Sequence, residues 1–233
     1  MKRLLLASTS TVYGGTYLSY LQEELTDLFT GIDEILFIPY ARPSGITHDE
    51  YTAIAQQGFE KIQKRVVGLH TFADPKAALA QAKAIFTGGG NTFLLVTRLY
   101  ELGLMPILRE VVAGGTPYMG TSAGSNIAGH TMQTTNDMPI IYPPSFQTLG
   151  AVSFNINPHY LDPDSHSKHK GETRETRIKE FHKFNDIPVI GLREGSWLRI
   201  TDDQIELKGN LTARVFLKDQ PPYETTDLSP VYP

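Results

Sequence analysis

The sequence predicts an α/β fold built around a doubly wound, mostly parallel β-sheet. Short, continuously apolar segments alternate with segments whose apolar residues recur at helical spacing, the pattern of a parallel sheet covered by helices on both faces. The chain of 233 residues is long enough to bury a sizeable core, and we expect one domain over residues 1–233. Ligands of such sheets bind beyond the carboxyl ends of the strands, so residues that follow a strand are the candidates for chemistry.

The first half of the chain alternates regularly between the two patterns. Residues 35–38 (ILFI) are continuously apolar, which is typical of a strand buried on both faces. Leucines at positions 18, 21, 25 and 28 have the spacing of one helix face. The predicted strands are 3–7, 34–40, 65–69, 84–87 and 116–119. The predicted helices are 18–29, 48–63, 75–82, 91–101 and 106–113.

The second half is less regular. Residues 138–144 are rich in proline and predict a loop. Two further strands, 152–156 and 188–192, flank a helix predicted over 172–184. The segments 196–201, 204–207 and 213–217 predict a terminal antiparallel set, and the prolines after residue 220 predict an extended tail.

Charge and residue usage narrow the classes of function. The chain has 21 basic and 25 acidic residues, and its net charge of -4 argues against binding nucleic acid. The absence of cysteine excludes disulfides, thiolate nucleophiles and Cys-ligated metal sites. No apolar run approaches the ~20 residues of a membrane span, and the apolar run near the basic N-terminus is too short for a signal peptide. We therefore expect a soluble, cytoplasmic protein that binds no membrane.

A glycine-rich bend in the middle of the chain holds the candidate nucleophile. Residues 120–124 read Gly-Thr-Ser-Ala-Gly and lie between a predicted strand and a helix that begins at Ala123. A serine in such a bend projects its hydroxyl outward, and glycines two positions away are needed because a Cβ there would meet neighbouring backbone. The motif predicts Ser122 as a nucleophile at the carboxyl edge of the sheet. The alternative is a tight turn around a buried, structural serine.

A serine needs a general base, and the base needs a group to orient it. Of the seven histidines, His159 has the best setting, because it lies just past the end of the strand predicted over 152–156 and so at a sheet edge. Two carboxylates could orient it. Asp137 lies in a polar loop after the nucleophile helix, and Glu194 follows the strand 188–192. Sequence spacing does not choose between them.

The glycine triplet 88–90 follows another predicted strand and suits an oxyanion hole. Glycines let the backbone approach a reacting carbonyl, so we expect the amides of Gly89 and Gly90 to act with that of Ala123. The rival interpretation, a phosphate-binding loop, lacks the Lys-Ser/Thr of a P-loop and the spacing of the dinucleotide fingerprint.

His159 and the polar loop after it form a loose set of potential metal ligands: His159, Asp162, Asp164, His166 and His169. None of its histidine pairs has the i, i+4 spacing of a zinc-protease helix. We expect a solvated loop with no bound metal.

Six motifs together resemble the peptidase E family, the α-aspartyl dipeptidases of peptidase family S51. They are 88–93 (GGGNTF), 120–126 (GTSAGSN), 134–139 (TTNDMP), 155–159 (NINPH), 170–174 (KGETR) and 191–195 (GLREG). The resemblance extends over residues 1 to about 215. It implies a fold like the class I glutamine amidotransferases, a flavodoxin-like three-layer sandwich with serine at the bend. It also implies hydrolysis of dipeptides with N-terminal aspartate, without cofactor or metal.

The resemblance implies roles for individual residues. Ser122 matches the nucleophile and His159 the general base, whereas either Asp137 or Glu194 matches the third member. Aspartate specificity needs a cation for the β-carboxylate of the substrate, and Arg174 is the candidate because its guanidinium can bind a carboxylate at two points. We place Asn91 with it in the substrate-binding set.

The expected partner is therefore a small Asp-X peptide, and the expected assembly is a monomer or weak homodimer. Two other functions stay open. One is a cyanophycinase-like serine exopeptidase acting on aspartyl polymers. The other is a non-catalytic, flavodoxin-like module that binds a ligand.

Overall fold

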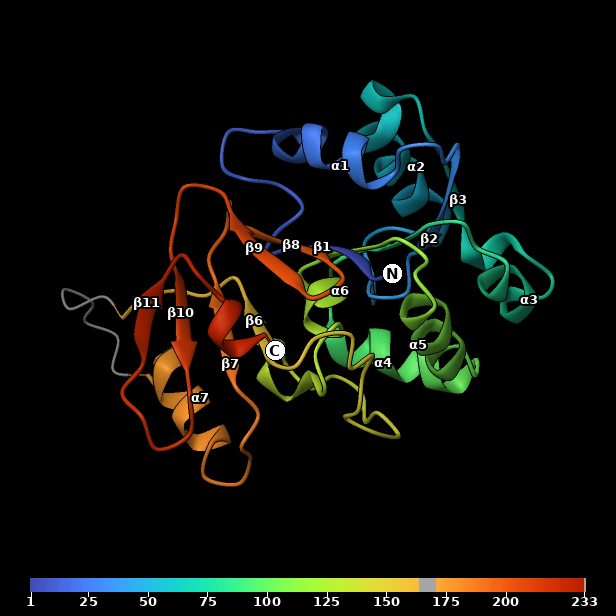
Figure 1. Cartoon of the computed structure of the whole chain (residues 1–233). Coiled ribbons are helices and arrows are strands. Elements are labelled where there is room, and N and C mark those ends of the chain that lie inside the picture. The colour runs from blue at the N-terminus through green and yellow to red at the C-terminus, as the bar shows by residue number, and fades with distance from the viewer. Residues whose placement is uncertain (164–170, 233) are drawn as a thin grey trace.

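The computed structural model describes residues 1–163 and 171–232, which form two β-sheets with helices packed around them (Figure 1). The larger sheet contains β1 (Arg3–Ala7), β2 (Glu34–Ile38), β3 (Arg65–Gly68), β4 (Ile85–Thr87), β5 (Tyr118–Thr121), β8 (Trp197–Thr201) and β9 (Gln204–Lys208). Its strand order is β3-β2-β4-β5-β1-β8-β9. The smaller sheet contains β6 (Asn155–Pro158), β7 (Val189–Leu192), β10 (Ala213–Phe216) and β11 (Tyr223–Thr225), in the order β11-β10-β7-β6.

The five strands from the first half of the chain pair in parallel, as predicted, and β8 and β9 add an antiparallel edge. The register fixes where functional segments can meet. Thr121 lies opposite Ala7, and Gly120 lies opposite Thr87. Strands β1, β4 and β5 therefore end together, and the segments that follow them leave from the same edge of the sheet.

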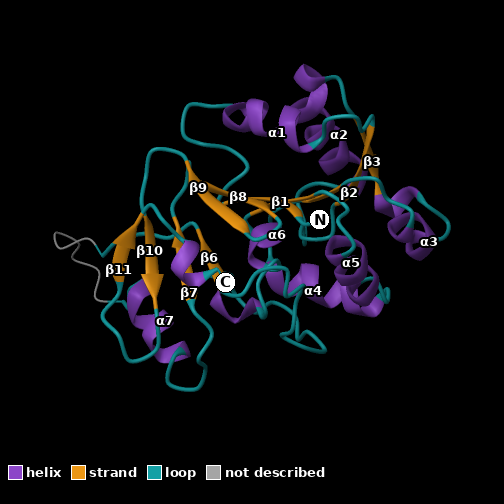
Figure 2. Cartoon of the chain, viewed as in Figure 1, coloured by secondary structure: helices purple, strands orange, loops and turns teal. Residues whose placement is uncertain are grey.

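Helices cover both faces of the larger sheet (Figure 2). They are α1 (Gln22–Leu28), α2 (His48–Phe59), α3 (Pro75–Ala80), α4 (Thr92–Glu101), α5 (Met105–Ala113) and α6 (Ala123–Asn126). A further helix, α7 (Arg174–Phe181), packs against the smaller sheet, where Ile178 joins Val189 and Phe216 in a small apolar cluster. Short 3-10 turns are η1 (Ser19–Leu21), η2 (Glu60–Ile62), η3 (Leu69–Thr71), η4 (Met132–Thr134) and η5 (Ser229–Val231). No helix in the described ranges has both the length and the apolar surface needed to cross a membrane.

The side chains of β1 alternate between the two faces of the larger sheet. Leu4 and Leu6 belong to the apolar core beneath α4 and α5, whereas Leu5 and Ala7 belong to a second core beneath α1 and α2. Successive side chains of a strand point to opposite faces, so continuously apolar strands bury both. Figure 1 shows α1 and α2 on one side of the sheet and α4 and α5 on the other, which confirms the doubly wound α/β prediction.

The smaller sheet is where the prediction was wrong in part. The segment 213–217 was expected beside 196–207, but β10 pairs with β7 and β11 in the other sheet. The tail is not simply extended either, because it contains β11 and η5. Val231 and Tyr232 of the tail are buried, at 7% and 5% exposure. Burial of these apolar side chains holds the tail against the core although the tail is rich in proline.

Candidate active site

Ser122 occupies a strained bend between β5 and α6. Its backbone has φ 52° and ψ -111°, a region that non-glycine residues rarely adopt. The glycines on either side are needed for close packing. A Cβ on Gly120 would lie 2.4 Å from the carbonyl oxygen of Gly124, and one on Gly124 would lie 2.2 Å from that of Thr87. The bend is thus over-determined by contacts around it, and it holds the serine hydroxyl at the edge of the sheet.

His159 and Glu194 complete a hydrogen-bonded chain with this serine. The Nε2 atom of His159 lies 2.8 Å from Oγ of Ser122, and its Nδ1 lies 2.5 Å from Oε1 of Glu194. The side chains of His159 and Glu194 are 34% and 51% exposed. The smaller sheet explains their proximity, because β6 and β7 are parallel neighbours with Pro158 opposite Leu192. The residues just after each strand therefore emerge side by side.

Ser8 anchors this segment, and sequence reasoning missed it. The backbone nitrogen of His159 donates to Oγ of Ser8 (2.8 Å), and that hydroxyl donates to the carbonyl of Leu192 (2.7 Å). Ser8 is fully buried directly after β1. It therefore links the larger sheet to both strand ends that carry His159 and Glu194. In the sequence, Ser8 could have been recognised as a small polar residue that directly follows a buried strand.

Asp137 makes its hydrogen bonds at the start of helix α4 and not with His159. Its Oδ2 accepts hydrogen bonds from the backbone nitrogen of Thr92 (2.7 Å), from the Thr92 hydroxyl (2.6 Å) and from the Thr135 hydroxyl (3.0 Å). Thr92 is the first residue of α4, so the carboxylate satisfies a backbone donor at the positive end of that helix. Of the two candidate carboxylates, Glu194 is the one hydrogen-bonded to the imidazole.

The glycine loop after β4 lies directly beside Ser122. A Cβ on Gly89 would approach Cβ of Ser122 to 3.0 Å, and Gly90 has φ 141°. Within the described residues, the amides of Gly89, Gly90 and Ala123 have no backbone acceptor, although the neighbouring amide of Asn91 donates to Ala41 (2.7 Å). Unpaired amides beside a serine hydroxyl are what an oxyanion requires.

Asn91 uses its side chain to fix this loop. Its Oδ1 accepts from the backbone nitrogen of Leu94 (3.1 Å) and caps α4, and its Nδ2 donates to the carbonyl of Met138 (2.9 Å). Both ends of the amide are therefore engaged within the protein. This arrangement ties the glycine loop to the segment that carries Asp137.

Arg174 is the first residue of α7, where the Thr173 hydroxyl caps the helix by accepting from the nitrogen of Thr176 (3.1 Å). Arg174 lines a small pocket together with Asn136 and Asn157. Asn157 belongs to β6, which leads to His159, and Asn136 donates to the carbonyl of Pro158 at the end of that strand. Burial lowers the pKa of Arg174, and the nearby charge of Arg177 lowers it further, whereas Asp137 opposes the shift. A guanidinium remains charged under such conditions, so a partly desolvated cation is available here.

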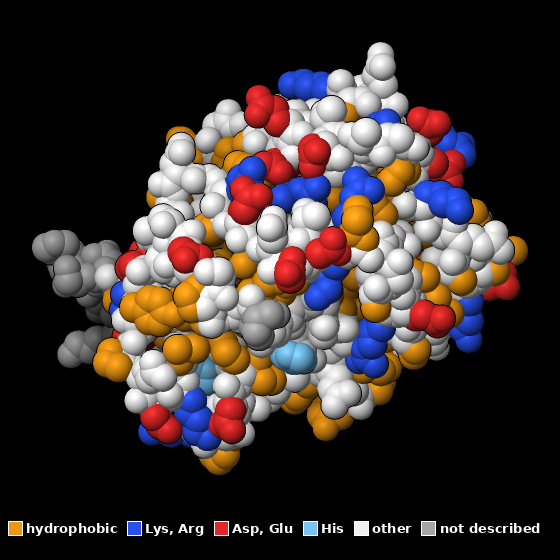
Figure 3. Space-filling model, viewed as in Figure 1, with side chains coloured by type: hydrophobic (Ala, Val, Ile, Leu, Met, Phe, Trp, Pro, Cys, Tyr) orange, Lys and Arg blue, Asp and Glu red, His pale blue; other side chains and the backbone are white. Residues whose placement is uncertain are grey.

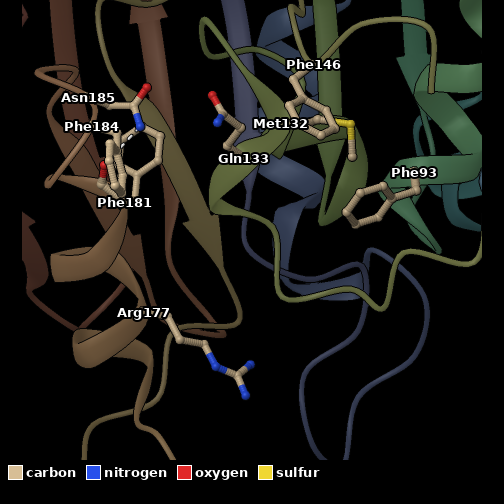
Figure 4. A pocket seen from close by; sticks show the side chains of 8 residues that line it. All are labelled: Phe93, Met132, Gln133, Phe146, Arg177, Phe181, Phe184 and Asn185. Atoms are coloured by element: carbon tan, nitrogen blue, oxygen red, sulfur yellow. Dashed lines mark hydrogen bonds between the residues drawn. The ribbon is translucent and has the colours of Figure 1, made fainter. Parts of the chain in front are cut away.

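A larger apolar groove of about 540 Å³ continues from this pocket (Figure 4). The two share Gln133, Arg177 and Phe181. In Figure 4, Met132, Phe146 and Phe93 lie across an opening from Phe181, Phe184 and Asn185. The groove therefore borders the Arg174 pocket, on the side of η4 and α4.

The expected polar cluster after His159 is only partly described. Asp164, His166 and His169 lie outside the described residues. Asp162 accepts from Arg193 at 2.7 Å, and His159 is engaged with Glu194 and Ser122. Within residues 1–163 and 171–232, no three His, Asp or Glu side chains gather in a way that could hold a metal ion. Figure 3 shows acidic and basic side chains interspersed over the face in view.

A serine hydroxyl bonded to an imidazole, which is bonded in turn to a carboxylate, is the arrangement that defines the class of serine-type hydrolases. Comparison with known proteins is consistent with that class. The model of peptidase family S51 matches residues 4–208, and the chain belongs to this family.

Two relatives are similar over nearly the whole chain. A Streptomyces coelicolor protein named "Peptidase E" is 49% identical over 221 residues, covering 95% of this chain and 90% of the relative. A Drosophila melanogaster protein named "Probable alpha-aspartyl dipeptidase" is 47% identical over 221 residues, covering 94% and 91%. The crystal structure of a peptidase from an acI-B1 Actinobacterium has the same fold, with a TM-score of 0.70, 18% identity and coverage of 97% and 94%.

Proposed function

We propose that this protein is a serine-type dipeptidase that hydrolyses dipeptides with an N-terminal aspartate, with Ser122 as nucleophile. The observation that carries the proposal is the hydrogen-bonded chain from Ser122 through His159 to Glu194, at 2.8 Å and 2.5 Å. Membership of peptidase family S51 and the names of the relatives support peptide hydrolysis in particular.

The reaction follows from the geometry. Nε2 of His159 accepts the hydroxyl proton while Oγ of Ser122 bonds to the carbonyl carbon of the substrate. The amides of Gly89, Gly90 and Ala123 donate to the negative oxygen that forms. His159 then gives its proton to the leaving nitrogen, and the C–N bond breaks. Water attacks the acyl-enzyme, gives a proton to His159 and releases aspartate, and that proton returns to Oγ.

We assign Glu194, and not Asp137, as the third member. Its carboxylate holds Nδ1–H of His159, which fixes the tautomer that leaves Nε2 ready to accept the serine proton. It also stabilises the imidazolium that forms during attack. Asp137 is committed to the start of α4 through Thr92.

Specificity for aspartate is assigned to Arg174. The β-carboxylate of the substrate needs a cation, and the guanidinium of Arg174 makes no ion pair with any described carboxylate while lining a pocket with Asn136 and Asn157. We assign Asn91 a supporting role, because its side chain holds the glycine loop rather than facing a ligand.

Both sheets belong to the proposed catalytic unit, residues 1–233. The larger sheet supplies Ser122 and the smaller sheet supplies His159 and Glu194, so neither alone holds the reacting groups. The cytoplasmic location and the monomeric or weakly dimeric state stay predictions, to be checked by cell fractionation and sedimentation.

The test is hydrolysis of Asp-Leu by the purified protein and by Ser122→Ala, together with labelling by a small fluorophosphonate. We expect Ser122→Ala to lose nearly all turnover and all labelling while keeping its circular dichroism spectrum. Parallel assays with β-Asp-Leu and an aspartyl polymer separate this function from that of a cyanophycinase-like exopeptidase. Parent-level cleavage by Ser122→Ala would rule out the mechanism.

A further inference from the structure

Two arginines differ from the others in their polar contacts. Arg42 and Arg174 have neither a hydrogen bond nor an ion pair with any described residue. The other arginines each contact a carboxylate or a backbone carbonyl. Arg174 is already assigned to the β-carboxylate of the substrate, whereas Arg42, which also lacks a polar partner among the described residues, has no assigned role.

Arg42 is exposed beside the glycine loop. Its guanidinium lies over the ring of Tyr51, 4.8 Å from the ring centroid. The buried hydroxyl of Tyr51 donates to the carbonyl of Gly89 (3.0 Å), and a Cβ on Gly89 would touch Ser122. One aromatic side chain thus connects the guanidinium to the loop that faces the nucleophile.

The backbone holds Arg42 in the same place. The carbonyl of Ala41, the preceding residue, accepts from the nitrogen of Asn91 (2.7 Å), and Gly90 packs so closely that a Cβ would lie 2.3 Å from that carbonyl. The guanidinium lies over the Tyr51 ring in a cation–π contact, and its N–H groups donate to no described residue, so they can bind a planar acceptor. The site is therefore suited to a carboxylate.

Arg42 and Arg174 are associated with opposite faces of the larger sheet. Tyr51, on which Arg42 packs, belongs to the core beneath α1 and α2. Arg174 begins α7, which contacts η4, and η4 contacts α4 on the other face of the sheet. A ligand that crosses the sheet edge over Ser122 would meet one guanidinium at each end.

We infer that Arg42 binds the C-terminal carboxylate of the dipeptide. This rests on the proposed function, since an Asp-X dipeptide carries two carboxylates that flank its scissile bond. Arg174 holds the side-chain carboxylate and Arg42 holds the chain terminus. Each added residue lengthens an extended peptide by ~3.3–3.6 Å, so a cation fixed at this position favours dipeptides over longer substrates.

The test compares Asp-Leu with Asp-Leu amide, in which the terminal carboxylate is replaced by a carboxamide. For Asp-Leu, we expect Arg42→Met to raise KM by about 10-fold to 100-fold with kcat nearly unchanged, because a charge-assisted contact is lost. The KM for the amide should not change. Arg42→Lys should recover part of the affinity, and Arg65→Met, which removes an exposed arginine paired with Glu34, is the matched control.

The possible outcomes distinguish failure of this inference from failure of the proposed function. If Arg42→Met changes the KM values of both substrates equally, or of neither, then Arg42 does not bind the terminal carboxylate, and the dipeptidase proposal still stands. If the unaltered protein cleaves neither substrate, the proposed function fails and this inference fails with it. Calorimetric titration of Asp-Leu into Ser122→Ala, and into the double variant that also carries Arg42→Met, measures the binding affinity without turnover. Equal affinities there would also overturn the inference.

Discussion

Asp137 binds Thr92 through a single carboxylate oxygen, which accepts from both the backbone nitrogen (2.7 Å) and the hydroxyl (2.6 Å) of that residue. The contact holds the polar loop of Asp137 against the first turn of α4, directly after the glycine loop. It therefore gives Asp137 a defined task in the architecture of the site, distinct from that of Glu194, which contacts the imidazole of His159.

Replacing these two carboxylates should have different consequences. In Glu194→Gln the imidazolium loses its counter-charge, and we expect kcat for Asp-Leu to fall by about 100-fold or more. The short Nδ1–H hydrogen bond of His159 should give a downfield proton resonance in NMR spectra of the unaltered protein. That resonance should disappear or move sharply upfield in Glu194→Gln.

Asp137→Asn is the matched comparison. Three hydrogen bonds to Oδ2 lose their charge assistance, so we expect the free energy of unfolding to fall by about 1–2 kcal/mol, measured by urea denaturation. The downfield resonance should persist. Its loss in Asp137→Asn and survival in Glu194→Gln would reverse our assignment of the third member.

Arg174→Met should weaken recognition of aspartate. Loss of a charged hydrogen bond costs about 1.5–3 kcal/mol, so kcat/KM for Asp-Leu should fall by about 10-fold to 150-fold. The same change should leave kcat/KM for Asn-Leu almost unaffected, because the amide gains little from a cation. Arg174→Lys, which keeps the charge but not the planar fork, should lie between the two. An undiminished preference for Asp over Asn in Arg174→Met would remove Arg174 from the substrate site.

Glu224 should make stability sensitive to acid. Hydrogen bonding to Arg193 is the main cause that lowers the pKa of this tail carboxyl from 4.5 to about 2, with a contribution from Thr212 and with burial opposing the shift. A carboxyl whose pKa is depressed by folding stabilises the protein above its unfolded pKa and loses that contribution as pH falls through the folded value. The relevant window therefore extends from pH 4.5 down to about 2.

The measurement is urea denaturation of the unaltered protein and Glu224→Gln between about pH 6 and pH 3. The variant should be less stable at pH 6, and the difference in unfolding free energy should shrink as the pH falls. A constant difference would mean that Glu224 contributes no linked protonation. Because the side chain is 37% exposed, added salt should also narrow the difference at pH 6.

Much of the fold could be predicted because it depends on local patterns. Short, continuously apolar segments such as 35–38 are typical of strands buried on both faces, and leucines at helical spacing indicate the helices that cover the sheet. The partner of a strand is a different matter. The sequence of β10 predicts a strand, as do the sequences of β8 and β9 before it. β10 nevertheless pairs with β7, because pairing depends on apolar contacts with segments far away in sequence.

The sequence by itself determined that a serine lies in a glycine-flanked bend, that a histidine follows a strand, and that two carboxylates were available nearby. Only the tertiary structure decided between those carboxylates, because the parallel pairing of β6 and β7 brings Glu194 beside His159 while Asp137 is drawn to the start of α4. The same holds for the arginines. The motif 170–174 singled out Arg174, but whether a cation is neutralised depends on neighbours assembled from distant segments, so no local pattern distinguished Arg42 from arginines that pair within the fold.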